Sequence, residues 1–558
     1  MKDISILIGG KAGFGIDKSS LVIASILNQL GYSIYVYRDY PSLIRGGHTF
    51  SIIRASDGSI ASHKDKIDIL LALNQDTVNL HKARLSGGSV VVYDSDSIKP
   101  ETVDGPWKAM PVPLAGIVKA EGGQEIMRNV CIIGAMAKAA GVSWQIAEGV
   151  LRRHFPKEID VNLKIAERGY TASQEAFKID QLNNPPRSLL SGNEALALGL
   201  INGGLDAYLA YPMTPSSPIL HSLAGLAGEF GLKVIHPESE ISVMLMALGF
   251  SYAGKKVAVG TSGGGFCLMT EGLSFSGMAE LPVVVIMGQR PGPSTGLPTY
   301  SSQADLHFVL NAGQGEFPRF LVAPGDAEEA YYWAGVSLNI ASKFQVPAII
   351  LSDKNMGEGT YVFDLAKAAG NFREESPAEW DGKGEYKRYL NTSGGVSLLA
   401  FPPDKDAVIK VNSYEHDEMG ITTEDPEATV KMQDKRLRKE TLIKDELKRY
   451  ETVKIYGNKR SETVLLCWGS NKGVCEEVAK KLNVKAVQVV VLSPFPVEKL
   501  KDALAGANKI IAVESNATAQ LVRLINSFGS GVHGKVLKYD GRPFSVEELT
   551  KKIEGLMR

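Results

Sequence analysis

The sequence predicts an α/β protein with mainly parallel sheets, divided into three α/β units. Two observations lead to this class. Apolar segments of strand length alternate with amphipathic segments of helix length, and Gly-rich turns join them. Glycine accounts for 57 of the 558 residues, which exceeds the roughly 7% of an average protein. At about 150 residues per domain, a chain of this length has room for three or four domains.

The composition excludes several classes of function. The 61 basic and 62 acidic residues give a net charge of −1, so no overall charge attracts nucleic acid or an anionic membrane. No apolar run reaches the roughly 18 residues of a membrane span, and the first residues do not resemble a signal peptide. The cysteines form no C-x-x-C pair, so we expect no disulfide framework, no iron–sulfur or zinc site, and a reducing cytoplasm. They are Cys131, Cys267, Cys467 and Cys475.

The first predicted unit covers residues 1–180. A strand at 4–8 leads through a Gly-rich turn into a helix with one apolar face. That face holds Val22, Ile23, Ile26, Leu27 and Leu30. Further strands are expected at 32–37, 67–73 and 90–93, and a helical stretch is expected at 129–153. This alternation predicts a largely parallel sheet with helices packed against it.

Two polar segments divide the rest of the chain. A linker is expected at 181–192, because Pro185-Pro186 fit neither a helix nor a central strand. The second α/β unit, 193–370, has predicted strands at 233–235, 257–260, 283–287 and 348–351. An irregular segment, 371–460, ends in a charged helix near 433–450, and a third α/β unit, 461–558, has predicted strands at 463–467, 487–492 and 509–513.

Two loops of the first unit are candidates for phosphate binding. Residues 9–15, Gly-Gly-Lys-Ala-Gly-Phe-Gly, join a strand to a helix, where backbone N–H groups favour an anion. Asp39 follows the next strand, as a ribose-binding acid does in a dinucleotide fold. The glycine spacing fits neither G-x-G-x-x-G nor a P-loop, so a tight packing turn is an equal alternative. Arg45, followed by two glycines, can hold a phosphate or belong to a plain surface turn.

In the second unit, the loop 211–217 reads Tyr-Pro-Met-Thr-Pro-Ser-Ser. Two prolines restrict the backbone around Thr214, which favours a rigid loop that presents hydroxyl groups to a substrate. A capped turn between a strand and a helix is the alternative.

Three further features follow other strands of that unit. Glu240 opens an apolar helix, either as a proton partner in a cleft or as a first-turn acid that complements the helix dipole. The Gly-rich segment 260–265 and the loop of Arg290 each follow an apolar strand, at the edge where open α/β sheets bind ligands. Arg290 can capture a carboxylate there, although most single arginines are ordinary surface residues.

Taken together, these motifs resemble those of a known enzyme family. The α subunit of the 2-oxoacid:ferredoxin oxidoreductases is similar in the order and spacing of Gly192-Asn193-Glu194-Ala195, the 211–217 loop, Glu238-Ser239-Glu240, the 261–265 segment and the Arg290 loop. The first unit resembles the γ subunit of these enzymes, fused ahead of α. The motif at 416–420, His-Asp-Glu-Met-Gly, and the basic helix after it are similar to the 2-oxoglutarate type.

The resemblance implies thiamine diphosphate as a cofactor. In the family, a glutamate contacts N1′ of the aminopyrimidine and favours the imino tautomer, whose nitrogen deprotonates the thiazolium C2. Glu240 matches this catalytic glutamate better than Glu238, because it directly precedes the apolar helix. Pro212 is expected beside the pyrimidine.

The resemblance also implies residues for the two substrates. Thr214 matches the threonine that hydrogen-bonds the 2-oxoacid, and Arg290 matches the arginine that binds its carboxylate. Tyr211 and Ser216 are expected beside the same molecule. For CoA, the implied positions are Gly13, Arg45 and Gly46.

One departure implies a partner subunit. The motif G-D-G, which holds the diphosphate and Mg²⁺ in thiamine enzymes, is missing, since Gly325-Asp326 is followed by Ala327. In the family, this motif and a [4Fe-4S] cluster lie on a β subunit, so the chain is expected to be half of an active site in an αβ heterodimer or (αβ)₂ heterotetramer. The third unit is similar to the transketolase C-terminal domain.

The implied reaction converts a 2-oxoacid, CoA and oxidised ferredoxin to acyl-CoA, CO₂ and reduced ferredoxin, or runs in the reverse, carboxylating direction. We expect 2-oxoglutarate as the acid, with pyruvate or a branched-chain 2-oxoacid as alternatives. A nucleotide-binding regulatory or scaffold protein is a further alternative, carried by the first glycine loop and Asp39. A self-sufficient thiamine decarboxylase is disfavoured by the missing G-D-G.

Overall fold

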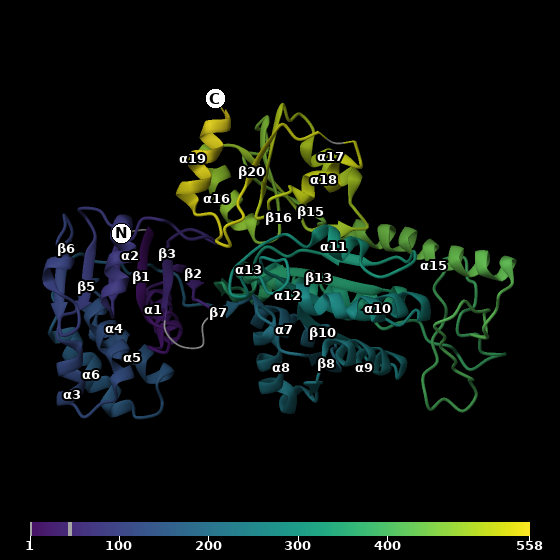
Figure 1. Ribbon diagram of the computed structural model, residues 1–558, viewed down its shortest axis with the longest axis horizontal. Coiled ribbons are helices and arrows are strands. Elements are labelled where there is room, and N and C mark those ends of the chain that lie inside the picture. Colours follow the sequence, from purple (N-terminus) through teal and green to yellow (C-terminus); the bar gives the residue numbers. More distant parts are fainter. Residues whose placement is uncertain (1–2, 43–46, 530, 558) are drawn as a thin grey trace. The chain divides into compact units, whose positions relative to one another are not determined.

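A computed structural model describes residues 3–42, 47–529 and 531–557 (Figure 1). The chain forms two compact units. Unit 1 comprises Met1–Leu190, Glu358–Asp364 and Phe544–Arg558, and unit 2 comprises Ser191–Gly357 and Leu365–Pro543. The predicted borders of the four segments stay predictions, but the grouping differs at the C-terminus, since residues 544–558 join unit 1 rather than the third α/β unit.

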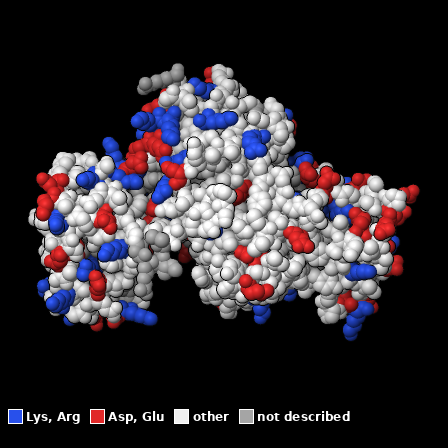
Figure 2. Space-filling model, viewed as in Figure 1, with Lys and Arg blue, Asp and Glu red and all other residues white. Residues whose placement is uncertain are grey.

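The apolar character of the helices and the distribution of surface charge agree with the composition. Within the described ranges, no helix is long and apolar enough to cross a membrane. On the face drawn in Figure 2, basic and acidic side chains are interspersed, which matches a net charge close to zero.

Unit 1 is built on an eight-stranded sheet in the order β6-β5-β4-β1-β3-β2-β14-β7. Its strands are β1 (Asp3–Lys11), β2 (Ser33–Asp39), β3 (His48–Ser56), β4 (Ile69–Ala72), β5 (Val90–Asp94), β6 (Lys108–Val112), β7 (Ser188–Ser191) and β14 (Thr360–Phe363). The series β1-β4-β5-β6 is parallel, whereas β3 is antiparallel to both β1 and β2. The predicted α/β class is confirmed, but this sheet is mixed, because the unpredicted strand β3 returns the chain beside β1.

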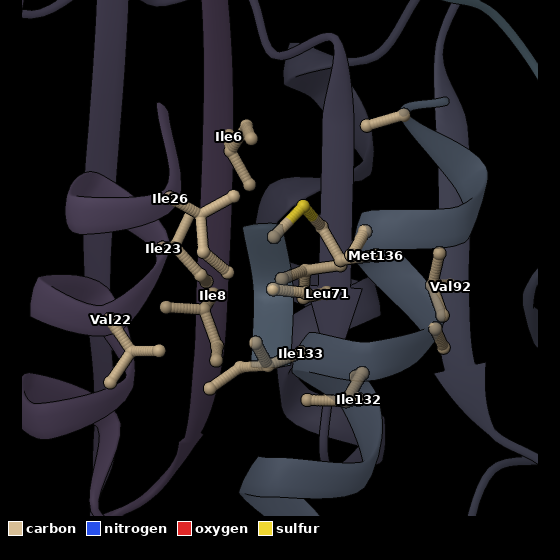
Figure 3. Packing of buried hydrophobic residues seen from close by; sticks show 14 of the residues in the cluster. Ile6, Ile8, Val22, Ile23, Ile26, Leu71, Val92, Ile132, Ile133 and Met136 are labelled. Carbon is tan, nitrogen blue, oxygen red and sulfur yellow. The ribbon is translucent and has the colours of Figure 1, made fainter. Parts of the chain in front are cut away.

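The helices of unit 1 are α1 (Ile16–Gln29), α2 (Gln75–His81), α3 (Leu114–Ala120), α4 (Arg128–Ala139), α5 (Trp144–His154), α6 (Ile159–Thr171) and α19 (Val546–Met557), with 3-10 turns at Lys82–Arg84, Pro100–Thr102 and Glu125–Met127. The helix predicted over 129–153 is two helices, because Gly141 adopts a φ of 68° between them. Figure 3 shows the core, in which Ile8 of β1 packs with Ile23 of α1 and Ile133 of α4.

Unit 2 contains a seven-stranded sheet in the order β18-β12-β13-β11-β10-β8-β9. Its strands are β8 (Ala207–Ala210), β9 (Lys233–Ile235), β10 (Val257–Ser262), β11 (Val283–Gln289), β12 (Phe320–Val322), β13 (Pro347–Asp353) and β18 (Val491–Ser493). All neighbouring pairs except β12–β18 are parallel. After β8 the chain first adds β9 on one side and then β10 on the other, so the carboxyl ends of β8 and β10 flank a topological switch point.

The helices of this part of the described chain are α7 (Gly192–Asn202), α8 (Ser217–Phe230), α9 (Glu240–Tyr252), α10 (Gly263–Ala279), α11 (Leu306–Asn311), α12 (Ala327–Phe344), α13 (Lys354–Glu358) and α14 (Leu365–Ala369). The capping box of Ser191 and Glu194 begins α7 at the end of the predicted linker. The last residues of that linker form β7, because the backbone is already extended before the cap.

A smaller sheet of unit 2, here the C-terminal sheet, has the order β15-β17-β16-β19-β20. Its strands are β15 (Val453–Gly457), β16 (Thr463–Trp468), β17 (Lys485–Val489), β19 (Lys509–Glu514) and β20 (Gly534–Leu537), and its helices are α16 (Asn471–Leu482), α17 (Val497–Leu504) and α18 (Gln520–Asn526). The strand predicted at 487–492 is two short strands, β17 and β18, which belong to different sheets.

The segment between the two sheets of unit 2 contains the long helix α15 (Pro426–Glu446), followed by a 3-10 turn at Leu447–Arg449. The helix begins before the predicted residue 433, because the Asp425 side chain accepts a hydrogen bond from the Ala428 N–H at 2.8 Å and proline fits the first helical position. Two buried lysines of α15, Lys435 and Lys439, pair with the buried carboxylate of Glu280, which fastens the helix to the end of α10.

Candidate functional site

The candidate residues of unit 2 lie at the carboxyl edge of its central sheet. The loop of Thr214 follows β8, Glu240 follows β9, the glycines 263–265 follow β10, and Arg290 follows β11. These strands flank the switch point between β8 and β10, where open α/β sheets form a ligand-binding crevice. The fold therefore brings these candidate residues, which are far apart in the sequence, to the same edge of the sheet.

Glu240 is the first residue of α9 and is only 5% exposed. Ser239 caps the helix by accepting a hydrogen bond from the Ser242 N–H. Glu238, the other candidate, is exposed and accepts a hydrogen bond from the Ser242 hydroxyl, which lowers the pKa of its carboxyl. The buried position next to the sheet edge is thus occupied by Glu240, as its proposed role requires.

A glycine of α10 makes room for the Glu240 carboxylate. A Cβ atom on Gly265 would lie 2.6 Å from Oε1 of Glu240 and would also collide with Oγ1 of Thr261. Within the described part of the chain, the Glu240 carboxylate has no hydrogen-bond or ion-pair partner. The carboxylate is therefore free to accept a hydrogen bond from a ligand that carries an N–H group.

The loop of Thr214 is held from both sides. The Asn193 amide of α7 donates a hydrogen bond to the Pro215 carbonyl at 3.0 Å, and the Thr214–Pro215 peptide bond is cis. Gly288 of β11 lies under the loop, because a Cβ atom there would come 2.9 Å from the Pro215 ring. The Ser216 hydroxyl donates to the Met213 carbonyl at 2.9 Å, so in this structure it closes the turn.

Arg290 bonds this loop and lies within electrostatic range of Asp305, a carboxylate that the sequence analysis missed. Its Nη1 donates a hydrogen bond to the Thr214 carbonyl at 3.0 Å. Asp305 is its electrostatic neighbour; burial raises the pKa of Asp305 to about 6, although Arg290 acts in the opposite direction. Burial also lowers the pKa of Arg290. Asp305 lies close to the first residue of α10, because a Cβ atom on Gly263 would be 3.6 Å from its carboxylate.

Tyr211 and Pro212 are more exposed than the residues around them. Tyr211 is 39% exposed, and its ring meets His236, at the end of β9, edge-on at 5.9 Å. Pro212 is exposed beside it. Both residues are thus accessible from solvent where the chain leaves β8.

The residues predicted for CoA belong to unit 1. Gly13 has a φ of 94°, is exposed, and has no atom within 4 Å of a Cβ position. Arg45 and Gly46 lie outside the described residues. Asp39 is buried at the end of β2 and accepts a hydrogen bond from the Tyr37 hydroxyl at 2.9 Å.

The sequence Gly325-Asp326-Ala327 has a structural role. The Asp326 side chain caps α12 by accepting a hydrogen bond from the Glu329 N–H at 3.0 Å, and it pairs with Lys472 of α16. Asp326 therefore links α12, next to the central sheet, to α16 of the C-terminal sheet. All four cysteines are free thiols, and Cys267 is the exposed one among them.

Comparisons with known proteins decide the family. A model described as pyruvate flavodoxin/ferredoxin oxidoreductase, thiamine diphosphate-binding, matches residues 198–435. A second, described as pyruvate ferredoxin/flavodoxin oxidoreductase, matches residues 5–172. The 2-oxoacid:ferredoxin oxidoreductase subunit alpha of Saccharolobus solfataricus is 31% identical over 629 residues, covering 100% of this chain and 98% of the relative. The chain belongs to the 2-oxoacid:ferredoxin oxidoreductase α-subunit family.

The α subunit also resembles a solved structure over its full length. The 2-oxoglutarate:ferredoxin oxidoreductase of Magnetococcus marinus, described with 2-oxoglutarate, coenzyme A and succinyl-CoA bound, is 29% identical with a TM-score of 0.92, and 100% of both chains is covered. A 2-oxoglutarate oxidoreductase subunit of Mycobacterium tuberculosis is 26% identical over 608 residues and covers 100% of this chain and 92% of the relative. The predicted order, with a γ-like unit ahead of a thiamine diphosphate-binding region, is confirmed.

Proposed function

We propose that this α subunit works in a 2-oxoglutarate:ferredoxin oxidoreductase, which converts 2-oxoglutarate, CoA and oxidised ferredoxin to succinyl-CoA, CO₂ and reduced ferredoxin, or runs in the carboxylating direction. The observation that carries the proposal is the convergence of Glu240, Thr214 and Arg290 at one edge of the sheet. The choice of acid is supported by the full-length similarity to the Magnetococcus marinus enzyme and its bound 2-oxoglutarate.

The residues of this edge fit the pyrimidine of thiamine diphosphate. When bound, this cofactor supplies the carbanion chemistry that decarboxylation of a 2-oxoacid requires. Glu240 would share a proton with the pyrimidine N1′, which would give the buried carboxylate the donor that the described chain does not offer it. Pro212 would border the pyrimidine.

Arg290 would bind a carboxylate of the 2-oxoacid. Its guanidinium offers several N–H donors, and the Thr214 carbonyl engages only one of its nitrogens. Thr214, Tyr211 and Ser216 would orient the acid beside it. Gly13, Arg45 and Gly46 are the proposed CoA contacts of unit 1, on the ground that glycine loops and arginine suit phosphate groups.

The partner in this proposal is a β subunit that carries G-D-G, Mg²⁺ and a [4Fe-4S] cluster, in an αβ or (αβ)₂ assembly in the cytoplasm. An apolar face of α9 and α10 supports such a partner. Ile241, Leu245 and Leu268 are each 49% exposed and Met246 is 41% exposed. An apolar surface of this kind beside a binding crevice is typical of a protein interface.

The test is a substrate panel on the complex of this chain co-expressed with its β partner. Reduction of a viologen dye is measured with CoA and with 2-oxoglutarate, pyruvate or a branched-chain 2-oxoacid. We expect the highest kcat/KM for 2-oxoglutarate and no activity from this chain alone. A preference for pyruvate or a branched-chain acid would contradict the proposed substrate, and activity of the isolated chain would contradict the shared active site.

A further inference from the structure

The C-terminal sheet has a topological switch point of its own, and a side chain from a loop of the central part of unit 2 lies there. β17 lies on one side of β16 and β19 on the other, so the carboxyl ends of β16 and β19 flank a switch point. Gln303, from the loop between β11 and α11, is fully buried there. A place where sheets of this kind bind ligands is therefore occupied by a residue of the same chain.

The polar groups of Gln303 are satisfied by residues of the C-terminal sheet. Its Nε2 donates to the Trp468 carbonyl at 2.8 Å, and its Oε1 accepts from the Asn471 amide at 2.6 Å and from the Ser515 N–H at 3.0 Å. Its own N–H donates to the Ser515 carbonyl at 2.8 Å, and its carbonyl accepts from the Asn516 amide at 3.1 Å. A buried network in which every member is paired fixes a backbone firmly.

The anchored loop leads directly to the substrate edge. The Gln520 amide of α18 donates to the Ala304 carbonyl, and the Asp305 N–H donates to Oε1 of Gln289 at 3.1 Å. Gln289 directly precedes Arg290, which donates to the Thr214 carbonyl. Hydrogen bonds thus run from the C-terminal sheet to Gln289, whose neighbour in the chain, Arg290, bonds the Thr214 carbonyl.

We propose that Gln303 is a positioning residue for 2-oxoacid binding: by filling the switch point of the C-terminal sheet, it holds the Asp305 N–H on the side chain of Gln289, the residue before Arg290, and so fixes the arginine for the substrate carboxylate. The inference rests on the proposed role of Arg290. It gives the C-terminal sheet a part in substrate binding, beyond the structural one that its fold suggests.

The test compares two buried glutamines in the co-expressed complex. Gln303→Ala removes the anchor. Gln488→Ala is the matched control, because Gln488 is also fully buried in the C-terminal sheet. Among the described residues, its side chain bonds Glu329 of the central part and Tyr456, and not the loop of Gln303. Both variants leave buried partners unpaired, so both should lower the Tm. We expect Gln303→Ala to raise the KM for the 2-oxoacid about tenfold or more with little change in kcat, because a misplaced binding group weakens substrate capture.

The outcomes separate the inference from the proposed function. A KM of Gln303→Ala within about twofold of wild type, or a KM shift equal to that of Gln488→Ala, would overturn the inference. If Gln303→Ala does not assemble, Asn471→Ala, which removes one hydrogen bond to Oε1, decides in the same way: a raised KM supports the inference and an unchanged KM overturns it. Arg290→Ala is measured alongside, and an unchanged KM in that variant would instead refute the role of Arg290.

Discussion

Replacing Gly265 with alanine tests how Glu240 is held at the edge of the sheet. A Cβ atom on Gly265 would lie 2.6 Å from Oε1 of Glu240, whereas ordinary contact begins at 3.4 Å. The glutamate oxygen therefore has to retreat by about 0.8 Å. Thr261 restricts the alternatives, because its hydroxyl oxygen lies against the same Cβ position.

Two effects follow from this displacement. Overpacking costs about 1–3 kcal/mol, while the better helix propensity of alanine offsets about 0.8–1.0 kcal/mol. The net loss of stability is therefore modest, about 0–2 kcal/mol. A misplacement of about 1 Å near the reacting atoms can lower a rate about 100-fold, so we expect kcat for 2-oxoacid-dependent viologen reduction to fall about 10- to 100-fold.

Gly225→Ala provides the matched control for this measurement. Gly225 lies in the middle of α8 with nothing within 4 Å of its Cβ position, so alanine should leave kcat unchanged and keep or raise the Tm. Both variants are assayed as the co-expressed complex, with thermal unfolding measured on the same samples. A Gly265→Ala complex with the kcat of wild type would refute the close confinement of Glu240 against α10.

Three further predictions concern other parts of the chain. Burial raises the pKa of Asp305 to about 6, so its carboxylate gains negative charge near Arg290 as the pH rises. The KM for the 2-oxoacid should therefore increase between about pH 5 and 7 in wild type and stay flat in Asp305→Asn. Parallel pH profiles of the two enzymes would contradict this prediction. Glu280→Gln leaves two buried lysines without a counter-charge and should destabilise unit 2 by about 3–5 kcal/mol, seen as a lower Tm than that of the exposed control Glu271→Gln; equal Tm values would count against it. Leu245→Asp, on the exposed face of α9, should abolish co-purification of the β partner while the chain keeps its circular dichroism spectrum, and retention of the partner would show that this face is not the interface.

The sequence predicts the central sheet of unit 2 well, because its parallel strands are continuous apolar runs such as 257–260 and 283–287. It fails where tertiary contacts override local pattern. Strand β3 contains a buried charge, Arg54, whose partner Asp3 lies on β1. A charged residue usually indicates an exposed position, so the burial of this strand is seen only in the folded sheet. Residues 491–493 follow a strand of the C-terminal sheet but pair with β12 of the central sheet, which no local signal indicates.

The candidate site was predictable where a residue belongs to a recognisable motif. Glu240, Thr214 and Arg290 follow successive strands, and parallel topology brings the ends of such strands together. Asp305 and Gln303 carry no such signal, since they lie in a loop of ordinary polar composition. Their significance comes from partners far along the chain, such as Asn471 for Gln303, and only the fold reveals it.

The central claim is that this chain supplies half of a thiamine diphosphate active site through Glu240. The most direct measurement compares viologen reduction, with 2-oxoglutarate and CoA, by the chain alone, by the β partner alone, and by co-expressed pairs that carry Glu240 or Glu240→Gln. We predict activity only in the pair that retains the glutamate, with a loss of at least about 100-fold in Glu240→Gln. Full activity of the Glu240→Gln pair, or activity of the chain without its partner, would contradict the account.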